Sequence, residues 1–265
     1  MRVLKLKIYQ PQAHYRIPFT YQRRHTYPIP PYSTVKGMLC NLLGIRKGIE
    51  RIENKISDDD MMKLKKLMQL KVSICGNFQS KSSEYIWFRN LSKNSHIERF
   101  GYSENRKVSG GIEHPGGQMP VIIDILNDVE VVIYLFHENS GFIEIIKKSF
   151  LEEPSMRIYP LHLGRAEDFI VISEISEIDL KVLEVEANYD KFFWIPERIY
   201  KNNECNFEFN KIIGITYNLP TFYFISSGRR NFEYARFKLN DGDLGGIRMF
   251  FDEIEKLPVF FFSFR

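Results

Sequence analysis

The sequence predicts an α+β fold with two parts, a ferredoxin-like domain at residues 1–177 and a smaller, mainly β subdomain at residues 178–265. The first observation is the order of the hydrophobic patterns, which is strand, helix, strand, strand pair, helix and strand, close to the split β-α-β plan. The second is that short extended runs separated by polar turns fill the sequence after residue 178. A hydrophobic content of 44% is ample for a core in a chain of 265 residues.

The N-terminal patterns predict the first elements. Residues 1–9 alternate between apolar and polar side chains, which is typical of a half-buried strand. An apolar repeat at helical spacing follows, and we expect Ser33 to be its N-cap and Gly44 to end it. A second helix is expected at residues 58–70, where three aspartates precede the apolar repeat. Their negative charges are favourable at the N-terminal, positive end of the helix dipole.

Residues 76–119 are expected to form a β-hairpin arm that protrudes from the first domain. Residues 84–89 have a strand pattern, in which the alternation favours a core position for Trp87, and a polar stretch marked by glycines follows. The basic residues of that stretch expected to contact a partner are Arg99, Arg106 and Lys107. Because phosphates attract such cations and exposed bases stack on the interleaved aromatic rings, the arm favours a nucleic-acid partner. The alternative is a surface loop without a partner.

The middle and C-terminal patterns complete the predicted fold. Two β-branched runs at residues 121–126 and 129–136 are expected to pair as a hairpin around a turn at Asn127–Asp128. The apolar run Val259–Phe262 is expected in a buried strand or an assembly contact. The remaining expected elements are a helix at 141–150 and strands at 169–173, 181–186, 192–195, 212–217, 221–225, 233–239 and 259–264.

Composition narrows the class of protein. The formal net charge is only +4, so a nucleic-acid partner has to be argued from local clusters of basic residues. Cys40, Cys75 and Cys205 are too few and too far apart for a disulfide framework or a metal site, and we expect a reducing cytoplasm. No apolar run is long enough to span a bilayer, so no membrane partner is expected. No cofactor fingerprint and no metal-ligand spacing occur, so no cofactor and no metal are expected.

Residues 23–44 form the candidate site. The free amide groups of the first helical turn and the positive end of the dipole favour an anion, with Arg23 and Arg24 on the approach. The helix face expected to point away from the core carries Lys36, Gly37, Cys40 and Asn41. Because a glycine within a helix costs about 1 kcal/mol relative to alanine, Gly37 indicates a close approach by a ligand such as a phosphate. The alternative is a plain helix entry with solvated arginines.

Three motifs, in this order along the chain, resemble the RAMP superfamily of CRISPR-associated proteins. They are Pro30–Leu39, Met119–Val121 with Asp128–Val131 beyond it, and His162–Asp168. The resemblance covers the first two thirds of the chain. Within the superfamily the sequence is most similar to the crRNA 5′-handle-binding subunit of type I Cascade complexes, and most like its type I-B branch.

The resemblance implies a function and a set of partners. The arm corresponds to the family's thumb hairpin, and the subunit caps one end of a ribonucleoprotein filament and grips the crRNA 5′ handle. The implied protein partners are the Cascade backbone subunit and the large subunit that reads the PAM. Target DNA near the PAM is therefore an indirect partner. The chain is expected to be a non-catalytic RNA-binding subunit in antiviral defence.

Residues of the family's motifs and of the segment before the first helix are expected to contact the RNA. They are Arg23, Arg24, His25, Tyr27, Tyr32, Ser33, Thr34, Lys36, Gly37, Gly164 and Arg165. The cations would neutralise phosphates, and the two glycines would let the sugar-phosphate chain come close.

Several of these expectations concern how single side chains act. His25, Tyr27, Tyr32 and Trp87 are candidates for stacking on bases, although both tyrosines could instead pack beneath the loop and the core position is favoured for Trp87. Glu167 and Asp168 are expected to form a cap or a salt bridge beside Arg165 rather than to act as catalytic acids.

The competing hypothesis is a metal-independent endoribonuclease. In the type I-C branch of the same family, the equivalent subunit cleaves repeat RNA with the ribose 2′-OH as nucleophile. That chemistry needs a group that titrates near neutrality beside a cation. The candidates are His25 and Lys36 with Tyr32 or Tyr27 nearby, and more remotely His14. The adjacent Lys-His pair of the nuclease branch is absent, since none of the six histidines follows a lysine, and this favours the binding role.

Overall fold

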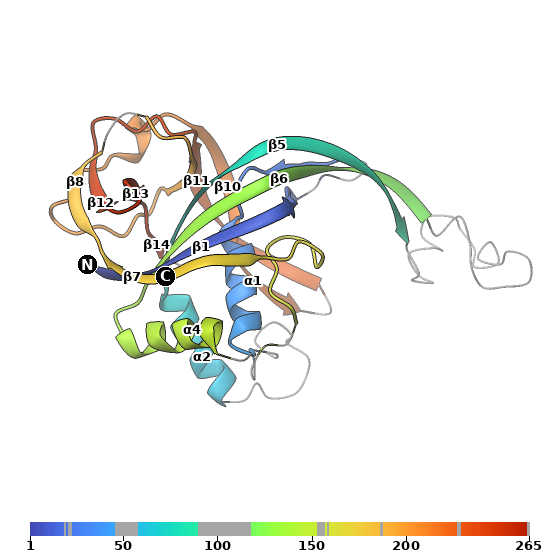
Figure 1. The fold of residues 1–265 in the computed structure, drawn as a ribbon, viewed down its shortest axis with the longest axis horizontal. Helices are drawn as coiled ribbons and strands as arrows, with labels where there is room; N and C mark the ends of the chain where they lie inside the picture. The colour runs from blue at the N-terminus through green and yellow to red at the C-terminus, as the bar shows by residue number, and fades with distance from the viewer. Residues whose placement is uncertain are drawn as a thin grey trace, which may run out of the picture.

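The computed structural model describes residues 1–18, 20, 23–45, 58–89, 118–152, 157, 159–185, 188–226 and 229–263. Within these residues a nine-stranded sheet forms the centre of the molecule (Figure 1). Its strands are β1 Arg2–Ala13, β3 Arg23–Arg24, β5 Lys71–Arg89, β6 Gln118–Phe136, β7 Val171–Asp179, β9 Phe192–Pro196, β10 Ile215–Ser226, β11 Arg229–Asn240 and β14 Phe262–Ser263.

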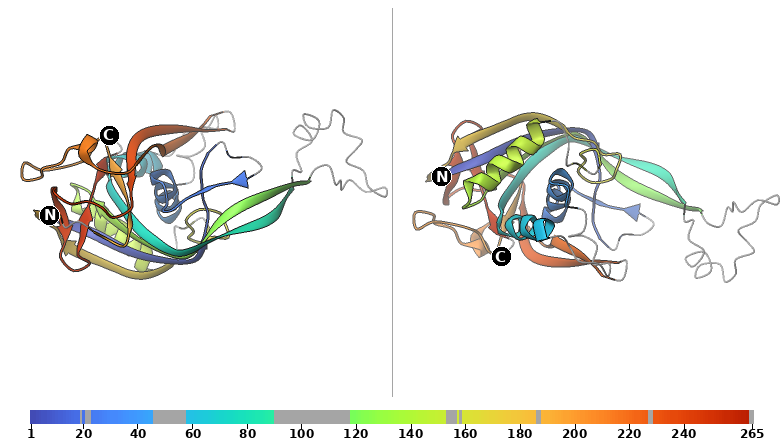
Figure 2. Two further views of the ribbon diagram at one scale, coloured as in Figure 1. Left: turned by 90° about the horizontal axis from the view of Figure 1, so that it is seen from above. Right: turned by 90° about the horizontal axis from the view of Figure 1, so that it is seen from below.

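The main sheet follows the order β10-β11-β9-β5-β6-β1-β7, with β14 paired to β5 and β3 paired to β6. These pairs are antiparallel except for β3 with β6. The helices are α1 Tyr32–Leu42, α2 Asp58–Gln69, α4 Ser140–Leu151 and the short 3₁₀ helix η3 Phe209–Lys211. Helices α1, α2 and α4 lie on one side of the main sheet (Figure 2). The fold is therefore a mixed α/β fold dominated by an antiparallel sheet.

Strand β1 shows how the sequence pattern builds the core. Leu4, Leu6 and Ile8 are at most 2% exposed and belong to the hydrophobic cluster that packs against Val35 and Leu39 of α1. The predicted strand at residues 1–9 is confirmed and continues to residue 13. The alternating apolar residues therefore face the helices, as the period of two requires.

Helix α1 begins two residues earlier than expected. Its N-cap is Pro31, in an extended conformation, and Ser33 lies inside the first turn, so the predicted N-cap is wrong. Proline is suited to a helix entry because its φ is fixed and it has no N–H to satisfy. At the other end Gly44 has φ +68°, and its N–H donates to the carbonyl of Asn41, which confirms the predicted termination.

The predicted helices at residues 58–70 and 141–150 are confirmed as α2 and α4. The N-cap of α4 is Asn139, whose side-chain oxygen accepts a hydrogen bond from the N–H of Phe142 at 3.3 Å. Neither these helices nor any other in the described part of the chain combines the length and the apolar character needed to cross a membrane.

The hairpin expected around Asn127–Asp128 is wrong, because residues 118–136 form the single strand β6. Asp128 has φ +53°, as a turn residue would, but the ladders to β1 and β5 continue on both sides of it. Its carboxylate accepts a hydrogen bond from the hydroxyl of Tyr9 at 2.8 Å. Two continuous neighbouring strands thus outweigh the local turn preference of the Asn-Asp pair.

Strands β5 and β6 pair from Lys71–Phe136 to Arg89–Gln118, and their far ends leave the body of the molecule as a curved ribbon (Figure 1). The expected arm corresponds to the outer part of this ribbon and to residues 90–117. The predicted contact residues Arg99, Arg106 and Lys107 lie outside the described residues. Trp87 is 59% exposed on the ribbon, so the core position predicted for it is wrong.

The C-terminal strands divide between two sheets. Strands β9, β10 and β11 extend the main sheet, whereas β8 Lys181–Glu184, β12 Arg248–Asp252 and β13 Leu257–Val259 form a separate sheet. The two strands expected at residues 212–217 and 221–225 are the single strand β10. The domain boundary expected at residue 178 falls within β7 and stays a prediction.

A second hydrophobic cluster lies under the small sheet. Phe260 and Phe261 are 1% and 0% exposed within it, which confirms that the Val259–Phe262 run is buried. A third, two-stranded sheet pairs β2 Tyr15–Arg16 with β4 Thr26–Tyr27. It folds the long segment between β1 and α1 back onto the sheet.

A buried ion cluster joins the main sheet to the sheet formed by β8, β12 and β13. The Lys5 side chain is 1% exposed, and its ammonium lies 2.8 Å from Glu255 and 3.0 Å from Glu174. Burial alone would lower the pKa of Lys5, but the hydrogen bonds to these carboxylates outweigh it and raise the pKa. Burial alone would likewise raise the pKa of Glu255, but hydrogen bonds from Lys5 and Lys7 hold it below its ordinary value.

Acid is therefore expected to loosen this cluster. A carboxyl group whose pKa is lower in the folded state stabilises the folded state at pH values above the ordinary glutamate pKa of about 4.3. That stabilisation is lost as the pH falls through the pKa of the folded state. The variant Glu255→Gln should lose roughly 2 kcal/mol of unfolding free energy near neutrality and less at acid pH. Urea unfolding across this range, with the exposed Glu253→Gln as control, measures the difference. Equal losses at both pH values would contradict the role of the ion cluster.

Candidate nucleic-acid interface

Two cations and a histidine surround one buried carboxylate where the β5–β6 ribbon leaves the body. Asp124 on β6 is 0% exposed. Its Oδ2 accepts hydrogen bonds from Lys81 Nζ of β5 at 2.7 Å and from His25 Nδ1 at 2.9 Å. Arg23 Nε lies 3.6 Å from Oδ1. We call Arg23, His25, Lys81 and Asp124 the Asp124 cluster.

The parallel pairing of β3 with β6 explains this arrangement. It places Arg23 beside Ile122 and Arg24 beside Ile123, so that the segment before α1 runs along the strand that carries Asp124. The His14 ring donates from Nδ1 to the backbone carbonyl of Asp124 at 2.7 Å, which adds a second contact to this part of the strand. Burial lowers the pKa of His14, which favours its neutral form.

The cluster presents positive charge to solvent. The side chains of Arg23, His25 and Lys81 are 59%, 45% and 45% exposed, whereas the carboxylate is covered. Burial alone would raise the pKa of Asp124, but hydrogen bonds from Lys81 and His25 hold the pKa below its ordinary value. The carboxylate is therefore ionised at neutral pH, and the exposed cations outnumber it. An anionic ligand is what such a surface attracts.

Aromatic rings continue from the cluster along the ribbon. Tyr85 and Trp87 lie four and six residues after Lys81 on β5, so the three side chains share one face of the strand. The two aromatic residues are 61% and 59% exposed. Their ring centroids lie 5.9 Å apart in an edge-on arrangement. The exposed Ile122 pairs with Tyr85 across the ladder, and Asp124 pairs with Ser83. Because cross-strand partners share a face, cations and rings lie along one face of the ribbon.

Arg165 is committed to contacts within the chain. Its Nε and Nη2 donate to Asp168 Oδ1 at 2.9 and 2.7 Å. The other oxygen, Asp168 Oδ2, accepts from the backbone N–H of Arg165 at 2.8 Å and of His14 at 2.9 Å. Glu167 and Glu84 lie 3.4 and 3.9 Å from the guanidinium. The predicted salt bridge of Asp168 and Glu167 to Arg165 is confirmed.

Gly164 makes this loop fit against the body. Its φ is +105°, and a Cβ there would lie 2.6 Å from Asp168 Oδ2 and 2.7 Å from the carbonyl oxygen of His14. Glycine is thus required by contacts within the chain. Gly37 differs, because the nearest atom to a Cβ there is the hydroxyl oxygen of Tyr223 at 3.9 Å.

The two glycines are expected to respond to alanine in opposite directions. Gly164→Ala should lower the unfolding free energy by several kcal/mol, because both contacts are far inside van der Waals distance. Gly37→Ala should raise it by up to about 1 kcal/mol, because alanine is the better helix former and has room. Thermal unfolding of both variants against the parent chain measures the signs, and a stable Gly164→Ala would contradict the close packing.

The helix face expected to point away from the core is covered, so this prediction is wrong. Lys36, Cys40 and Asn41 are 2%, 3% and 9% exposed. Strand β10 lies over the helix, and the Lys36 ammonium sits 2.8 Å from the ring centroid of Phe222. The Asn41 amide donates to the carbonyl of Tyr159 at 2.9 Å. Lys36 is therefore not placed to bind a phosphate at the start of α1.

The two tyrosines before and within α1 also belong to the core. Tyr27 is 3% exposed and lies edge-on to Trp194 and Tyr217, both at 5.7 Å. Tyr32 is 0% exposed and stacks on Phe237 at 4.7 Å. Burial raises the pKa of Tyr27 to about 12 and that of Tyr32 well above its ordinary value. The prediction that they stack on bases is wrong, and packing beneath the loop is what occurs.

The remaining predicted contacts are less accessible than expected. Ser33 is buried, Thr34 is half-buried, and Arg24 is half-buried beside the exposed Arg23. Burial and the nearby Arg16 lower the pKa of Arg24. The RNA-binding role of the other predicted residues stays a prediction. Among the described ones, the structure brings Arg23 and His25 together at an exposed surface.

Sequence reasoning missed Lys81 and Asp124. Lys81, Tyr85 and Trp87 occupy alternate positions of one strand, and that spacing could have been found had β5 been recognised as continuous from Lys71 to Arg89. No local signal indicates Asp124, because its partners lie on two segments far from it in the sequence.

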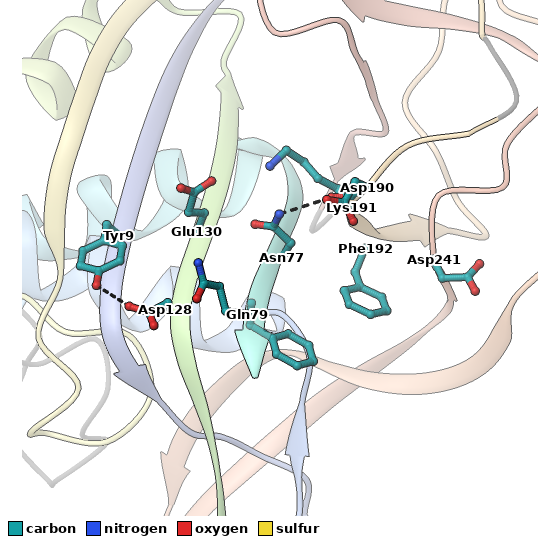
Figure 3. Close-up of a pocket in the computed structure, with 10 residues that line it drawn as sticks. Tyr9, Asn77, Gln79, Asp128, Glu130, Asp190, Lys191, Phe192 and Asp241 are labelled. Carbon is teal, nitrogen blue, oxygen red and sulfur yellow. Dashed lines mark hydrogen bonds between the residues drawn. The ribbon is translucent and has the colours of Figure 1, made fainter. Parts of the chain in front are cut away.

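A hollow of about 460 Å³ lies elsewhere on the sheet, between β1, β5, β6 and the segment leading into β9 (Figure 3). Its walls carry the carboxylates of Asp128, Glu130, Asp190 and Asp241 against the single ammonium of Lys191. Such a surface repels phosphates, so the hollow does not suit a nucleic acid. The described residues contain no group of three His, Cys, Asp or Glu side chains that could hold a metal.

The family model described as CRISPR-associated protein (Cas_Cas5) matches residues 3–223. The chain belongs to the Cas5 family. A comparison with curated proteins found no significant match to this Cas5 family member.

Solved structures share its fold at low sequence identity. A chain from a "CRISPR RNA-guided surveillance complex" is 13% identical, with a TM-score of 0.53, over 92% of this chain and 91% of that chain. A "Crystal structure of Cas protein" is 14% identical, with a TM-score of 0.43, over 98% of each chain. A CRISPR protein from Archaeoglobus fulgidus is 9% identical, with a TM-score of 0.41, over 99% of each chain. The first of these likenesses shows the fold of the Cas5 family member.

Proposed function

We propose that this Cas5 family member is the RNA-binding subunit of a type I CRISPR Cascade complex, of the type I-B branch, that grips the crRNA 5′ handle. The observation that carries the proposal is the Asp124 cluster continuing into Tyr85 and Trp87 on one face of the ribbon. Exposed cations neutralise backbone phosphates, and exposed rings offer stacking platforms for unpaired bases. A single-stranded handle presents both groups.

The architecture supports a ferredoxin-like domain with a thumb. Taken in chain order, β1, α1, β5, β6, α4 and β7 follow the split β-α-β order, and the four strands lie as β5-β6-β1-β7. We assign this domain to residues 1–177, the β-rich remainder to residues 178–265, and the thumb to residues 76–119. The protein partners we propose are the Cascade backbone subunit and the large subunit, with target DNA near the PAM as an indirect partner.

Direct binding of RNA tests the proposal. The purified chain is titrated with labelled RNA copied from the repeat of its own CRISPR array, with a scrambled RNA of the same composition and with the matching single-stranded DNA. Handle RNA should bind most tightly. Equal affinity for all three probes, or no binding, would contradict the proposed function.

The endoribonuclease alternative loses four of its candidates, because they are buried. His14, Tyr27, Tyr32 and Lys36 are at most 4% exposed, whereas His25 is exposed beside Asp124 and Lys81. We therefore expect the purified chain to leave repeat RNA uncut in the presence of EDTA, as gel analysis of the labelled RNA would show. Cleavage at the handle boundary that disappears in His25→Ala, with folding unchanged, would establish the nuclease instead.

A further inference from the structure

Asp124 is an unexpected residue at an RNA-binding surface. A negative charge beneath exposed cations weakens the attraction for phosphates, and burying a carboxylate is unfavourable unless its hydrogen bonds compensate. Yet Asp124 is fully buried, and its partners come from two other segments, Arg23 and His25 from the stretch before α1 and Lys81 from β5. Each partner keeps about half of its side chain exposed. The carboxylate thus gathers cations that would otherwise be independent.

We infer that Asp124 is a positioning residue for RNA binding, which holds Arg23, His25 and Lys81 together as one site for a backbone phosphate. The inference rests on the proposed function and deepens it. Lys81 Nζ and His25 Nδ1 share Oδ2, so these two nitrogens are held close to each other. Oδ1 accepts no hydrogen bond within the described part of the chain and faces Arg23 Nε at 3.6 Å.

The physical gain is preorganisation. Long lysine and arginine side chains lose rotamer freedom when they bind a phosphate, and a carboxylate that already restrains them removes part of that loss from the binding step. The restraint also keeps the cations on the face that carries Tyr85 and Trp87, so that phosphate and base are contacted in register. Loss of one negative charge and loss of this restraint have opposite effects on affinity, and a single variant therefore separates them.

Asp124→Asn provides that test, because it keeps the shape and removes the charge. If only net charge mattered, RNA affinity would rise. Positioning predicts a roughly tenfold loss of affinity for repeat RNA and a flatter dependence on salt. The matched control is Glu130→Gln, which removes an exposed charge from the same strand and should leave affinity unchanged or slightly higher. Fluorescence anisotropy at several salt concentrations measures both variants, with thermal unfolding as the check on folding.

A double-mutant cycle shows whether Asp124 acts through its partners. The loss caused by Asp124→Asn should shrink when Lys81 is already alanine, whereas additive losses would overturn the inference. If Asp124→Asn does not fold, Asp124→Glu moves the carboxylate at constant net charge and should still weaken binding several-fold. Unchanged or tighter binding by the folded variant overturns the inference alone. Absence of binding by the parent chain overturns the proposed function and the inference together.

Discussion

Replacing Arg23 and Lys81 together by alanine is expected to weaken binding of handle RNA by roughly a hundredfold. Hydrogen bonds to charged groups each contribute about 1.5–3 kcal/mol, and two are removed. Each lost phosphate contact should also reduce the slope of log affinity against log salt by about 0.7 on single-stranded RNA, or about 1.4 for the pair. Binding at several salt concentrations measures both quantities.

A matched control removes the same charge elsewhere. Lys148 on α4 and Lys201 before η3 are exposed and distant in sequence from the Asp124 cluster, so their joint replacement by alanine should change affinity and slope far less. If both double variants lose affinity equally, binding depends only on total charge, and the cluster is not the RNA site. If the Arg23/Lys81 variant binds as the parent chain does, its exposed cations face only water.

Local sequence signals predicted the elements that local chemistry determines. The alternation in residues 1–9 and the capping of α1 by Gly44 depend on neighbours a few residues away, and both occur in the structure. The prediction of a turn at Asn127–Asp128 was wrong because contacts with distant strands determine the structure there. Its backbone preference is real, as φ +53° at Asp128 shows, but β1 and β5 impose an uninterrupted strand.

The candidate site was harder to predict because tertiary contacts determine it. Helix α1 was expected to expose Lys36, but β10 covers that face, and the helical repeat contains no information about a strand far along the chain. The Asp124 cluster depends on the parallel pairing of β3 with β6, which joins residues about a hundred positions apart. A single sequence gives no local sign of such a pairing.

Removing Asp168 is expected to destabilise the protein strongly. Its two oxygens accept four hydrogen bonds from Arg165 and the backbone of His14, and its side chain is 1% exposed. Removing one partner of a buried ion pair typically costs about 3–5 kcal/mol, because the other charge remains buried without compensation. Asp168→Ala should therefore lower the unfolding free energy by that amount, measured by urea unfolding.

Glu167→Ala is the matched control, because Glu167 is the adjacent carboxylate, contacts the same guanidinium at 3.4 Å and has a 63% exposed side chain. Its removal should change stability by no more than about 0.5 kcal/mol, as is typical of exposed positions. A small loss for Asp168→Ala would mean that Arg165 is not held by this carboxylate. Arg165 would then be available to a phosphate, as the sequence predicted, and the RNA surface would extend from the Asp124 cluster to the Gly164 loop.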